Sequence, residues 1–393
     1  MKTKYLILFI VASFALTLPA TSYSSDNKVY IGLNAEFGHI TSTSDDAIKQ
    51  GILIAIDEIN RSGGVLGGRQ LGLIIRDNRA VPARAIQNNK ELAAVHDLAA
   101  VFCGKFSSAV IESLPVIHEL RLILLNPWAA NDKVIDNGYN PNYAFRLSLK
   151  DSWAIPAMMK YAKKQGFSKL GVLLINTSWG RNNLEVIRQY VAKNADVQIT
   201  EVQWFNYGDK SLLDKYNAVL KSGAQAVILV AIEAEGAILV KDMAGLPRQK
   251  RLPVISHWAI AGGDFPALTG PALGKVNLAF VQTFDLHTNK SNKARSVLAT
   301  ARKLLKVKDF SEVKSPAGLA HAYDLTHILA LAINKAGSTD RKKIRNALEQ
   351  VTKYDGLIKS YEQPFTGSNH EALGPDNLFM ARYNNDGTIE EIK

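Results

Sequence analysis

The residues of this chain that are best suited to hold a small molecule follow directly after short apolar runs. Gly104-Lys105-Phe106-Ser107-Ser108 follows the run at 99–103 and leads into a helical pattern. Ser107 and Ser108 can cap that helix, and the free N–H groups of its first turn, aided by the helix dipole, suit a carboxylate. Capping alone and carboxylate binding therefore both stay open at these two serines.

Three tryptophans occupy the same kind of position. An indole there either packs in the core or rim, or stacks on a ligand and shelters its cation from water. The three are Trp128 after the run at 122–125, Trp179 after 170–175 and Trp258 after 252–256. Ala129 and Ala130 follow Trp128 and leave the backbone approachable. Glu233 and His257 also follow apolar runs, and Glu233 is a candidate partner for a ligand cation.

Sequence motifs for catalysis are sparse. Gly104-Lys105 resembles part of a phosphate loop, but Phe106 stands where a Ser or Thr must bind magnesium. Neither Gly-x-Ser-x-Gly nor His-Glu-x-x-His occurs, and His321 and His327 lie six apart, a poor spacing for zinc. We interpret those histidines as surface or core residues. The sequence favours binding without chemistry, hence no enzyme, no metal and no cofactor.

Apolar runs alternate with helical patterns along the chain, which is typical of βαβ units with a parallel sheet covered on both faces. Strands are expected at 29–34, 71–75, 99–103, 122–125, 170–175, 226–230 and 252–256. Helices are expected at 47–61, 82–95, 109–120, 152–165, 292–305 and 316–335, with Asp45 and Asp46 capping the first. The number of these βαβ units is larger than one doubly wound sheet comfortably holds. We therefore predict an α/β fold of two doubly wound parallel-sheet lobes joined by a hinge.

Ligands of open α/β sheets bind beyond the carboxyl ends of the strands, where the residues named above fall. The chain is expected to cross between the lobes near Arg146-Leu147-Ser148 and again near 281–283. We assign residues 26–147 plus 283–370 to lobe 1 and residues 148–282 plus 371–393 to lobe 2.

The first residues indicate export. Lys2 and Lys4 precede an apolar run at 5–18, and small residues follow at 19–24, as in a secretory signal peptide at 1–24. Cys103 is the single cysteine, so an intramolecular disulfide is impossible, and no lipobox cysteine follows the apolar run. We expect a freely diffusing periplasmic protein.

The net charge of +11 falls to +9 without Lys2 and Lys4, so the exported chain stays basic. Basic residues are interspersed with acidic ones, and the densest group, at 248–251, reads as a solvated loop. Nucleic acid is therefore not an expected partner.

The chain resembles the type I periplasmic solute-binding proteins of ABC importers, specifically the branched-chain amino acid (Leu/Ile/Val) binding family. The resemblance covers essentially the whole mature chain. It is carried by VYIGL at 29–33, GILIAIDEIN at 51–60, GGVLGGRQL at 63–71, Asp77, LILLNP at 122–127 and Tyr323-Asp324.

The resemblance implies a hinged pair of lobes that closes on one small molecule and docks on membrane permease subunits of an ABC transporter, as a monomer. It also implies that Ser107 and the segment Trp128-Ala129-Ala130 grip the ligand carboxylate, and that Trp179 closes over the ligand. An acidic residue that the family commonly uses for the ligand ammonium is replaced here by His257-Trp258. The ligand is therefore predicted to be an amino acid, or a carboxylate without an amine, with aromatic acids as one hypothesis.

Two other functions remain to be distinguished. The same two-lobed module can act as a ligand-sensing receptor, and permease and ATPase genes beside its own would favour transport. An exported hydrolase or dehydrogenase would need a nucleophile with a base, or a dinucleotide fingerprint, and neither is visible in the sequence.

Overall fold

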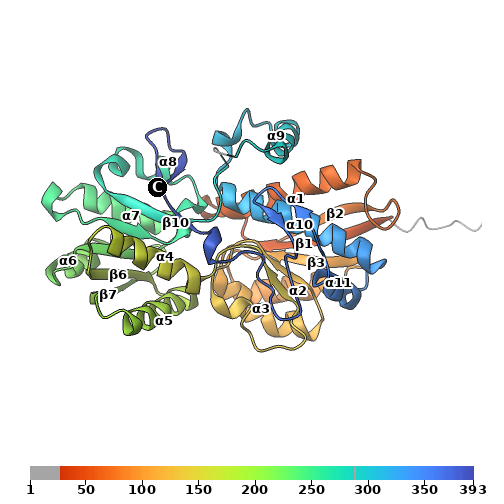
Figure 1. The fold of residues 1–393 in the computed structure, drawn as a ribbon, viewed down its shortest axis with the longest axis horizontal. Helices are drawn as coiled ribbons and strands as arrows, with labels where there is room; N and C mark the ends of the chain where they lie inside the picture. The colour runs from red at the N-terminus through yellow and green to blue at the C-terminus, as the bar shows by residue number, and fades with distance from the viewer. Residues whose placement is uncertain (1–26, 287–288) are drawn as a thin grey trace, which may run out of the picture.

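Two lobes, each built around its own sheet, make up this protein (Figure 1). The structure is a computed structural model that describes residues 27–286 and 289–393. The expected signal peptide at 1–24 lies outside the described residues. The chain starts in the lobe at the right of the figure and ends in the lobe at the left.

The sheet of the first lobe has five strands in the order β2-β1-β3-β4-β5, and every neighbouring pair is parallel. Every residue of its central strand β3 is buried, as expected for a sheet covered on both faces. The strands are β1 (Lys28–Ala35), β2 (Gln70–Asp77), β3 (Leu98–Cys103), β4 (Leu124–Asn126) and β5 (Ala144–Arg146).

Helices from both ends of the chain cover this sheet. They are α1 (Thr43–Arg61), α2 (Pro82–Ala93), α3 (Ser107–Glu119), α9 (Asn292–Leu305), α10 (Pro316–Ala336) and α11 (Arg341–Leu348). The apolar stripe of α1 is buried, and α1 packs along α10 and contacts α9. Gly51 permits this close approach, because a Cβ there would lie 2.1 Å from the carbonyl oxygen of Leu319.

The second lobe has a seven-stranded sheet in the order β14-β13-β10-β9-β8-β6-β7. The strands are β6 (Lys169–Ile175), β7 (Gln198–Phe205), β8 (Ala226–Val230), β9 (Val254–Ser256), β10 (Leu278–Gln282), β13 (Phe379–Tyr383) and β14 (Ile389–Glu391). Strands β6 to β10 pair in parallel, while β13 and β14 form an antiparallel edge. The helices are α4 (Asp151–Lys164), α5 (Ser178–Lys193), α6 (Leu213–Lys221), α7 (Glu233–Ala244) and α8 (Phe265–Thr269). A separate small sheet pairs β11 (Tyr354–Asp355) with β12 (Ser360–Tyr361).

The chain passes from one lobe to the other after β5, after β10 and before β13. A buried ion pair joins two of these passages. Arg146 Nε lies 2.7 Å from Glu371 Oε2, and Arg146 Nη2 lies 2.5 Å from Glu371 Oε1. Arg146 Nη1 also donates to the carbonyl oxygens of Ala129 and Asn131, so the guanidinium ties the passages to the loop after β4.

The predicted fold class is confirmed, and the expected strands and helices lie within a few residues of the observed ones. The prediction that Asp45 and Asp46 cap the first helix is wrong, because α1 begins at Thr43. The carboxylate of Asp45 instead accepts the backbone N–H groups of Glu36 and Lys105 from two strand ends. In the part of the chain that the structure describes, no helix has the length and apolarity to cross a membrane.

Candidate functional site

A cavity lies between the lobes at the carboxyl ends of the strands. Its lining residues come from both lobes: Lys105, Phe106, Ser107, Ser108, Trp128 and Ala130 from the first, and Thr177, Trp179, Tyr207, Ile232, Trp258 and Ala259 from the second. Its volume is about 20 Å³. A single water needs about 10–15 Å³ on this measure, so a ligand of amino-acid size enters only if the lobes or the indoles move.

The N-terminus of α3 faces this cavity through Ser107 and Ser108. Phe106 holds the N-cap position, so the expectation that the serine side chains cap the helix is wrong. Ser107 Oγ instead accepts the backbone N–H of Asn131 at 3.4 Å, which leaves its own proton able to reach a ligand. The first N–H groups of a helix have no intrahelical acceptor, and the helix dipole makes this end attractive to an anion.

The loop after β4 is folded around Asn126. Its Oδ1 accepts the backbone N–H groups of both Trp128 and Ala129, and its Nδ2 donates to the carbonyl of Ala129. The N–H of Ala129 is thus already engaged, and Ala129 is not among the residues lining the cavity. The N–H of Ala130 has no acceptor among the described residues, and Ala130 lines the cavity.

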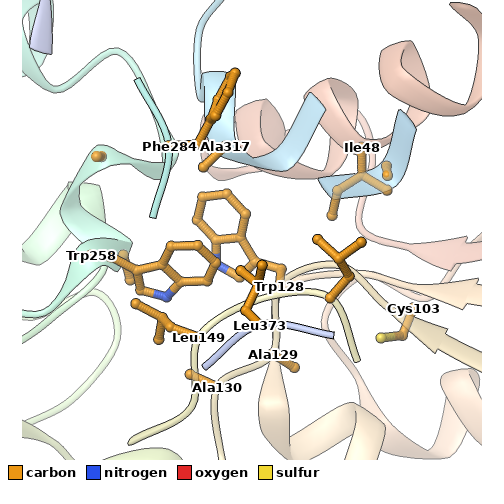
Figure 2. Packing of buried hydrophobic residues seen from close by; sticks show 14 of the residues in the cluster. Ile48, Cys103, Trp128, Ala129, Ala130, Leu149, Trp258, Phe284, Ala317 and Leu373 are labelled. Atoms are coloured by element: carbon orange, nitrogen blue, oxygen red, sulfur yellow. The ribbon is translucent and has the colours of Figure 1, made fainter. Parts of the chain in front are cut away.

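The indoles of Trp128 and Trp258 stack on each other between the lobes, as Figure 2 shows. Two glycines make room for the six-membered ring of Trp128: a Cβ at Gly262 or at Gly318 would lie only 3.2 or 3.1 Å from its carbons. Trp128 and Trp258 are 3% and 1% exposed, so the stack forms an apolar wall of the cavity.

Trp179 is held by Asp151, at the start of α4. The indole Nε1 donates to Asp151 Oδ1 at 3.0 Å, and Asn182 Nδ2 donates to Oδ2 at 2.7 Å. His257 Nε2 lies 3.1 Å from Oδ1 in a contact that is too poorly aligned for a hydrogen bond. His257 is fully buried and packs edge-on against Trp179 at 5.0 Å, so it supports the indole and does not line the cavity.

Glu233 is paired within the protein. Its Oε1 accepts from Lys105 Nζ at 2.8 Å, and the two side chains are 1% and 2% exposed. Lys105 belongs to the loop after β3 of the first lobe and Glu233 begins α7 of the second, so this ion pair crosses between the lobes. Glu233 Oε2 is buried without a hydrogen-bond partner among the described residues.

Asp45 positions the loop that carries Lys105. It accepts the Lys105 N–H at 2.8 Å and the Glu36 N–H at 2.9 Å. Gly104 is required between them, because a Cβ there would lie 2.8 Å from both Asp45 oxygens. Burial raises the pKa of the Asp45 carboxyl to about 7, against the opposing effects of Lys105 and the two N–H donors.

Five of the eight predicted site residues line one cavity: Ser107, Trp128, Ala130, Trp179 and Trp258. Ala129, Glu233 and His257 lie immediately behind it, as their contacts show. Sequence reasoning missed Lys105, although it lies two residues beyond the strand end at Cys103, and it missed Asp151, which lies at no strand end. It also missed Tyr207, whose ring meets Phe106 edge-on at 5.9 Å across the lobes.

The two helical histidines are accounted for by the surrounding structure. His321 is buried, with one ring nitrogen 2.9 Å from the Pro127 carbonyl and the other 3.0 Å from Thr283 Oγ1. His327 lies 3.5 Å from Glu58. No cluster of three His, Cys, Asp or Glu side chains suited to a metal occurs within residues 27–286 and 289–393.

Comparison with known proteins gives a consistent result. A family model described as periplasmic binding protein matches residues 28–388. A leucine-, isoleucine-, valine-, threonine- and alanine-binding protein of Pseudomonas aeruginosa is 24% identical over 313 residues, which are 78% of each chain.

Two solved structures share the fold. One is the branched-chain amino acid transporter substrate-binding protein of Streptococcus pneumoniae in complex with isoleucine, with a TM-score of 0.78 and 20% identity over 93% of this chain and 99% of that one. The other is an ABC transporter solute-binding protein of Rhodopseudomonas palustris in complex with benzoate. Its TM-score is 0.75, with 12% identity over 93% of this chain and 95% of that one.

Proposed function

Because the chain belongs to the periplasmic binding protein family, we propose that it captures a small carboxylate between its lobes and delivers it to the permease of an ABC importer. An extracytoplasmic location follows from this role, and the basic, apolar start of the sequence suits export. The related proteins described above bind benzoate or amino acids, among them leucine, isoleucine, valine, threonine and alanine, and each of these ligands carries a carboxylate.

The observation that carries the proposal is the meeting of two kinds of group at one cavity between the lobes. The first lobe contributes the N-terminus of α3 with Ser107, and the second contributes the indoles of Trp179 and Trp258. The helix N-terminus suits the anionic end of a ligand, and the indoles suit its apolar body. Trp128 adds an indole from the first lobe, whereas Trp179 and Trp258 reach the cavity from the second, so a ligand there contacts both lobes.

The mechanism that we propose is opening and closing about the three passages between the lobes. We assign residues 26–147 plus 283–370 to one moving body and 148–282 plus 371–393 to the other. The carboxylate docks first against Ser107, Ser108 and Ala130, and closure then brings Trp179 and Trp258 over it. Closure excludes water, which strengthens the hydrogen bonds to the carboxylate.

A thermal-shift screen of amino acids and small carboxylates against the purified mature chain tests this proposal. A ligand that binds only the folded state raises the melting temperature by mass action. We expect at least one carboxylate to do so, and we expect Ser107→Ala and Trp179→Ala to diminish the shift. A screen in which no carboxylate changes the melting temperature contradicts the proposal.

A carboxylate without an amine is the second candidate ligand class, and one observation favours it. Lys105 is the sole charged residue among those that line the cavity, and no acidic side chain lines it. The ligand ammonium of an amino acid would therefore find no free carboxylate on this lining.

A further inference from the structure

The ion pair between Lys105 and Glu233 bears directly on which carboxylates the site accepts. Glu233 is the acid that pairs with the charged group of the lining residue Lys105, since its Oε1 lies 2.8 Å from Lys105 Nζ. In an amino-acid site such a buried carboxylate would face the ligand ammonium. Here the cation that it faces belongs to the protein.

Other acids around the cavity already accept hydrogen bonds within the protein, although Glu235 Oε2 is unpartnered. Asp151 is fully buried and accepts hydrogen bonds from Trp179 and Asn182. Asp45 accepts two backbone N–H groups, and Glu235 accepts the N–H of Gly208 at 3.1 Å. Asp132 accepts from Asn182 at 2.8 Å. An ammonium brought into this desolvated space would have to displace one of these donors or reach Glu235 Oε2, which lies outside the lining, because a buried charge without a partner is strongly unfavourable.

The ammonium group of Lys105 has one N–H donor left for a ligand. An ammonium carries three N–H donors, of which one meets Glu233 and one meets the carbonyl oxygen of Thr41. The remaining donor and the N–H groups of Ser107 and Ser108 lie within four consecutive residues. This arrangement is suited to an anion and adds no negatively charged acceptor for an ammonium.

We propose that Lys105 occupies the place of a ligand ammonium at Glu233 and so makes the site selective for carboxylates that lack an α-amine. Lys105 is then a specificity-determining residue. The inference rests on the proposed function, because it presumes that a carboxylate binds between the lobes.

Among the described residues, Glu233 Oε2 and Glu235 Oε2 are the buried, unpartnered carboxylate oxygens that could oppose this selectivity, and Glu233 Oε2 belongs to the acid that pairs with Lys105. It is buried and unpartnered, and a Cβ on Gly262 would lie 3.3 Å from it. Glu233 and Gly262 do not line the cavity, so this oxygen does not open onto it. If it nevertheless receives a ligand ammonium, the wild-type protein prefers amino acids, and the proposal is overturned.

Calorimetric titration with matched pairs tests the inference. Each pair joins an amino acid to the acid of the same skeleton without the amine: leucine with 4-methylpentanoate, phenylalanine with 3-phenylpropanoate, and glutamate with glutarate. For the best-fitting pair we expect the wild type to bind the amine-free acid at least about tenfold more tightly, the scale of one unsatisfied charged group. In Lys105→Met the freed Glu233 can pair with a ligand ammonium, and we expect the preference to fall by at least about tenfold or to reverse.

Three further variants distinguish a specific role of Lys105 from a general disturbance of the fold. Lys105→Met/Glu233→Gln carries neither charge, so it should bind the amine-free acid more weakly than wild type without gaining affinity for the amino acid. Lys163→Met removes a surface lysine paired with Asp196 and should leave the preference unchanged. Far-ultraviolet circular dichroism checks that each variant is folded, and Glu233→Gln, which keeps Lys105, should keep the wild-type preference if Lys105→Met does not fold.

The possible failures are distinguishable. If wild type binds an amino acid as tightly as its amine-free partner, or more tightly, the inference is overturned and carboxylate capture stands. If Lys105→Met folds and keeps the wild-type preference, Lys105 does not set the specificity. If no member of any pair binds to wild type and the carboxylate screen is also negative, the proposed function itself fails.

Discussion

Trp128 and Trp258 stack across the boundary between the two lobes, with ring centroids 4.4 Å apart and an angle of 21° between the ring planes. Each indole follows a strand of its own sheet, so the stack joins the carboxyl ends of the two sheets (Figure 2). Together with the Lys105–Glu233 pair, it forms a contact that the lobes make directly with each other. Opening of the cavity must break this contact.

Removing one indole should therefore favour the open form. Aromatic pairs contribute about 0.5–1.5 kcal/mol beyond the area that they bury, so Trp258→Ala should shift the closed-to-open ratio of the ligand-free protein several-fold. The measurement is small-angle X-ray scattering, in which we expect a larger radius of gyration for the variant. Trp153→Ala is the control, because that partly exposed indole of α4 contacts Lys150 and does not line the interlobe cavity. Equal radii of gyration for Trp258→Ala and wild type would contradict the conclusion that the indole stack holds the lobes closed.

Ser107→Ala should weaken ligand binding without unfolding the protein. A hydrogen bond to a charged group contributes about 1.5–3 kcal/mol, so the dissociation constant should rise about 10- to 100-fold. The matched control is Ser113→Ala on the same helix, whose Oγ donates to the Ala109 carbonyl and does not reach the interlobe cavity. Titration calorimetry with the best ligand of the screen measures both. Equal losses in the two variants would mean that Ser107 acts only through the helix.

Four site residues could be predicted from sequence because ligands of open α/β sheets bind beyond the carboxyl ends of the strands. They are Ser107, Trp128, Trp179 and Trp258. Parallel strands place their carboxyl ends on one edge of a sheet, and that edge follows from the alternation of apolar runs and helices. The pairing of Lys105 with Glu233 could not be predicted in this way, because it depends on how closely two separate lobes approach. The hydrogen bond of Trp179 to Asp151 could not be predicted either, because Asp151 begins a helix and follows no strand end directly.

Seven strands of the fold were predicted from their apolar runs, whereas the antiparallel edge of the second sheet was missed because its apolar pattern is weak. Strands β13 and β14 are half exposed and carry Arg382, Glu390 and Glu391, so no buried run marks them. Their contribution is an antiparallel edge that returns the end of the chain to the second sheet. The position of Asp45 was misread because an acid near a helix start resembles a cap, whereas burial lets it bind two strand ends.

The Arg146–Glu371 pair should be a main contributor to stability at the passages between the lobes. Arg146 is fully buried, and truncating one partner of a buried pair costs about 3–5 kcal/mol because the other charge is left unpaired. Arg146→Met should lower the free energy of unfolding in urea by that amount, and Arg146→Met/Glu371→Leu should lower it less. Arg382→Met breaks an exposed pair with Glu390 and should have little effect. A double variant that is less stable than Arg146→Met would contradict this interpretation.

Stability should depend on pH through Asp45. Its folded pKa of about 7 exceeds the reference value of 3.8, so the folded state favours the protonated carboxyl. The contribution of the protonated Asp45 carboxyl to the free energy of unfolding is complete below pH 3.8, and it is lost as the pH rises through about 7. Relative to Asp45→Asn, wild type should lose up to about 1.4 kcal/mol of unfolding free energy per pH unit in this window. Urea denaturation at several pH values measures this, with Asp46→Asn, a half-exposed neighbour, as the control. Parallel pH profiles for wild type and Asp45→Asn would exclude Asp45 as the titrating group.

A crystal structure of the mature chain with the carboxylate that gives the largest thermal shift tests the central claim most directly. We predict that the carboxylate lies within hydrogen-bond distance of the N–H groups of Ser107 and Ser108, with the body of the ligand against Trp179 or Trp258 and both lobes in contact with it. A ligand bound outside the interlobe cavity, or one that contacts a single lobe with its carboxylate away from α3, would contradict the account.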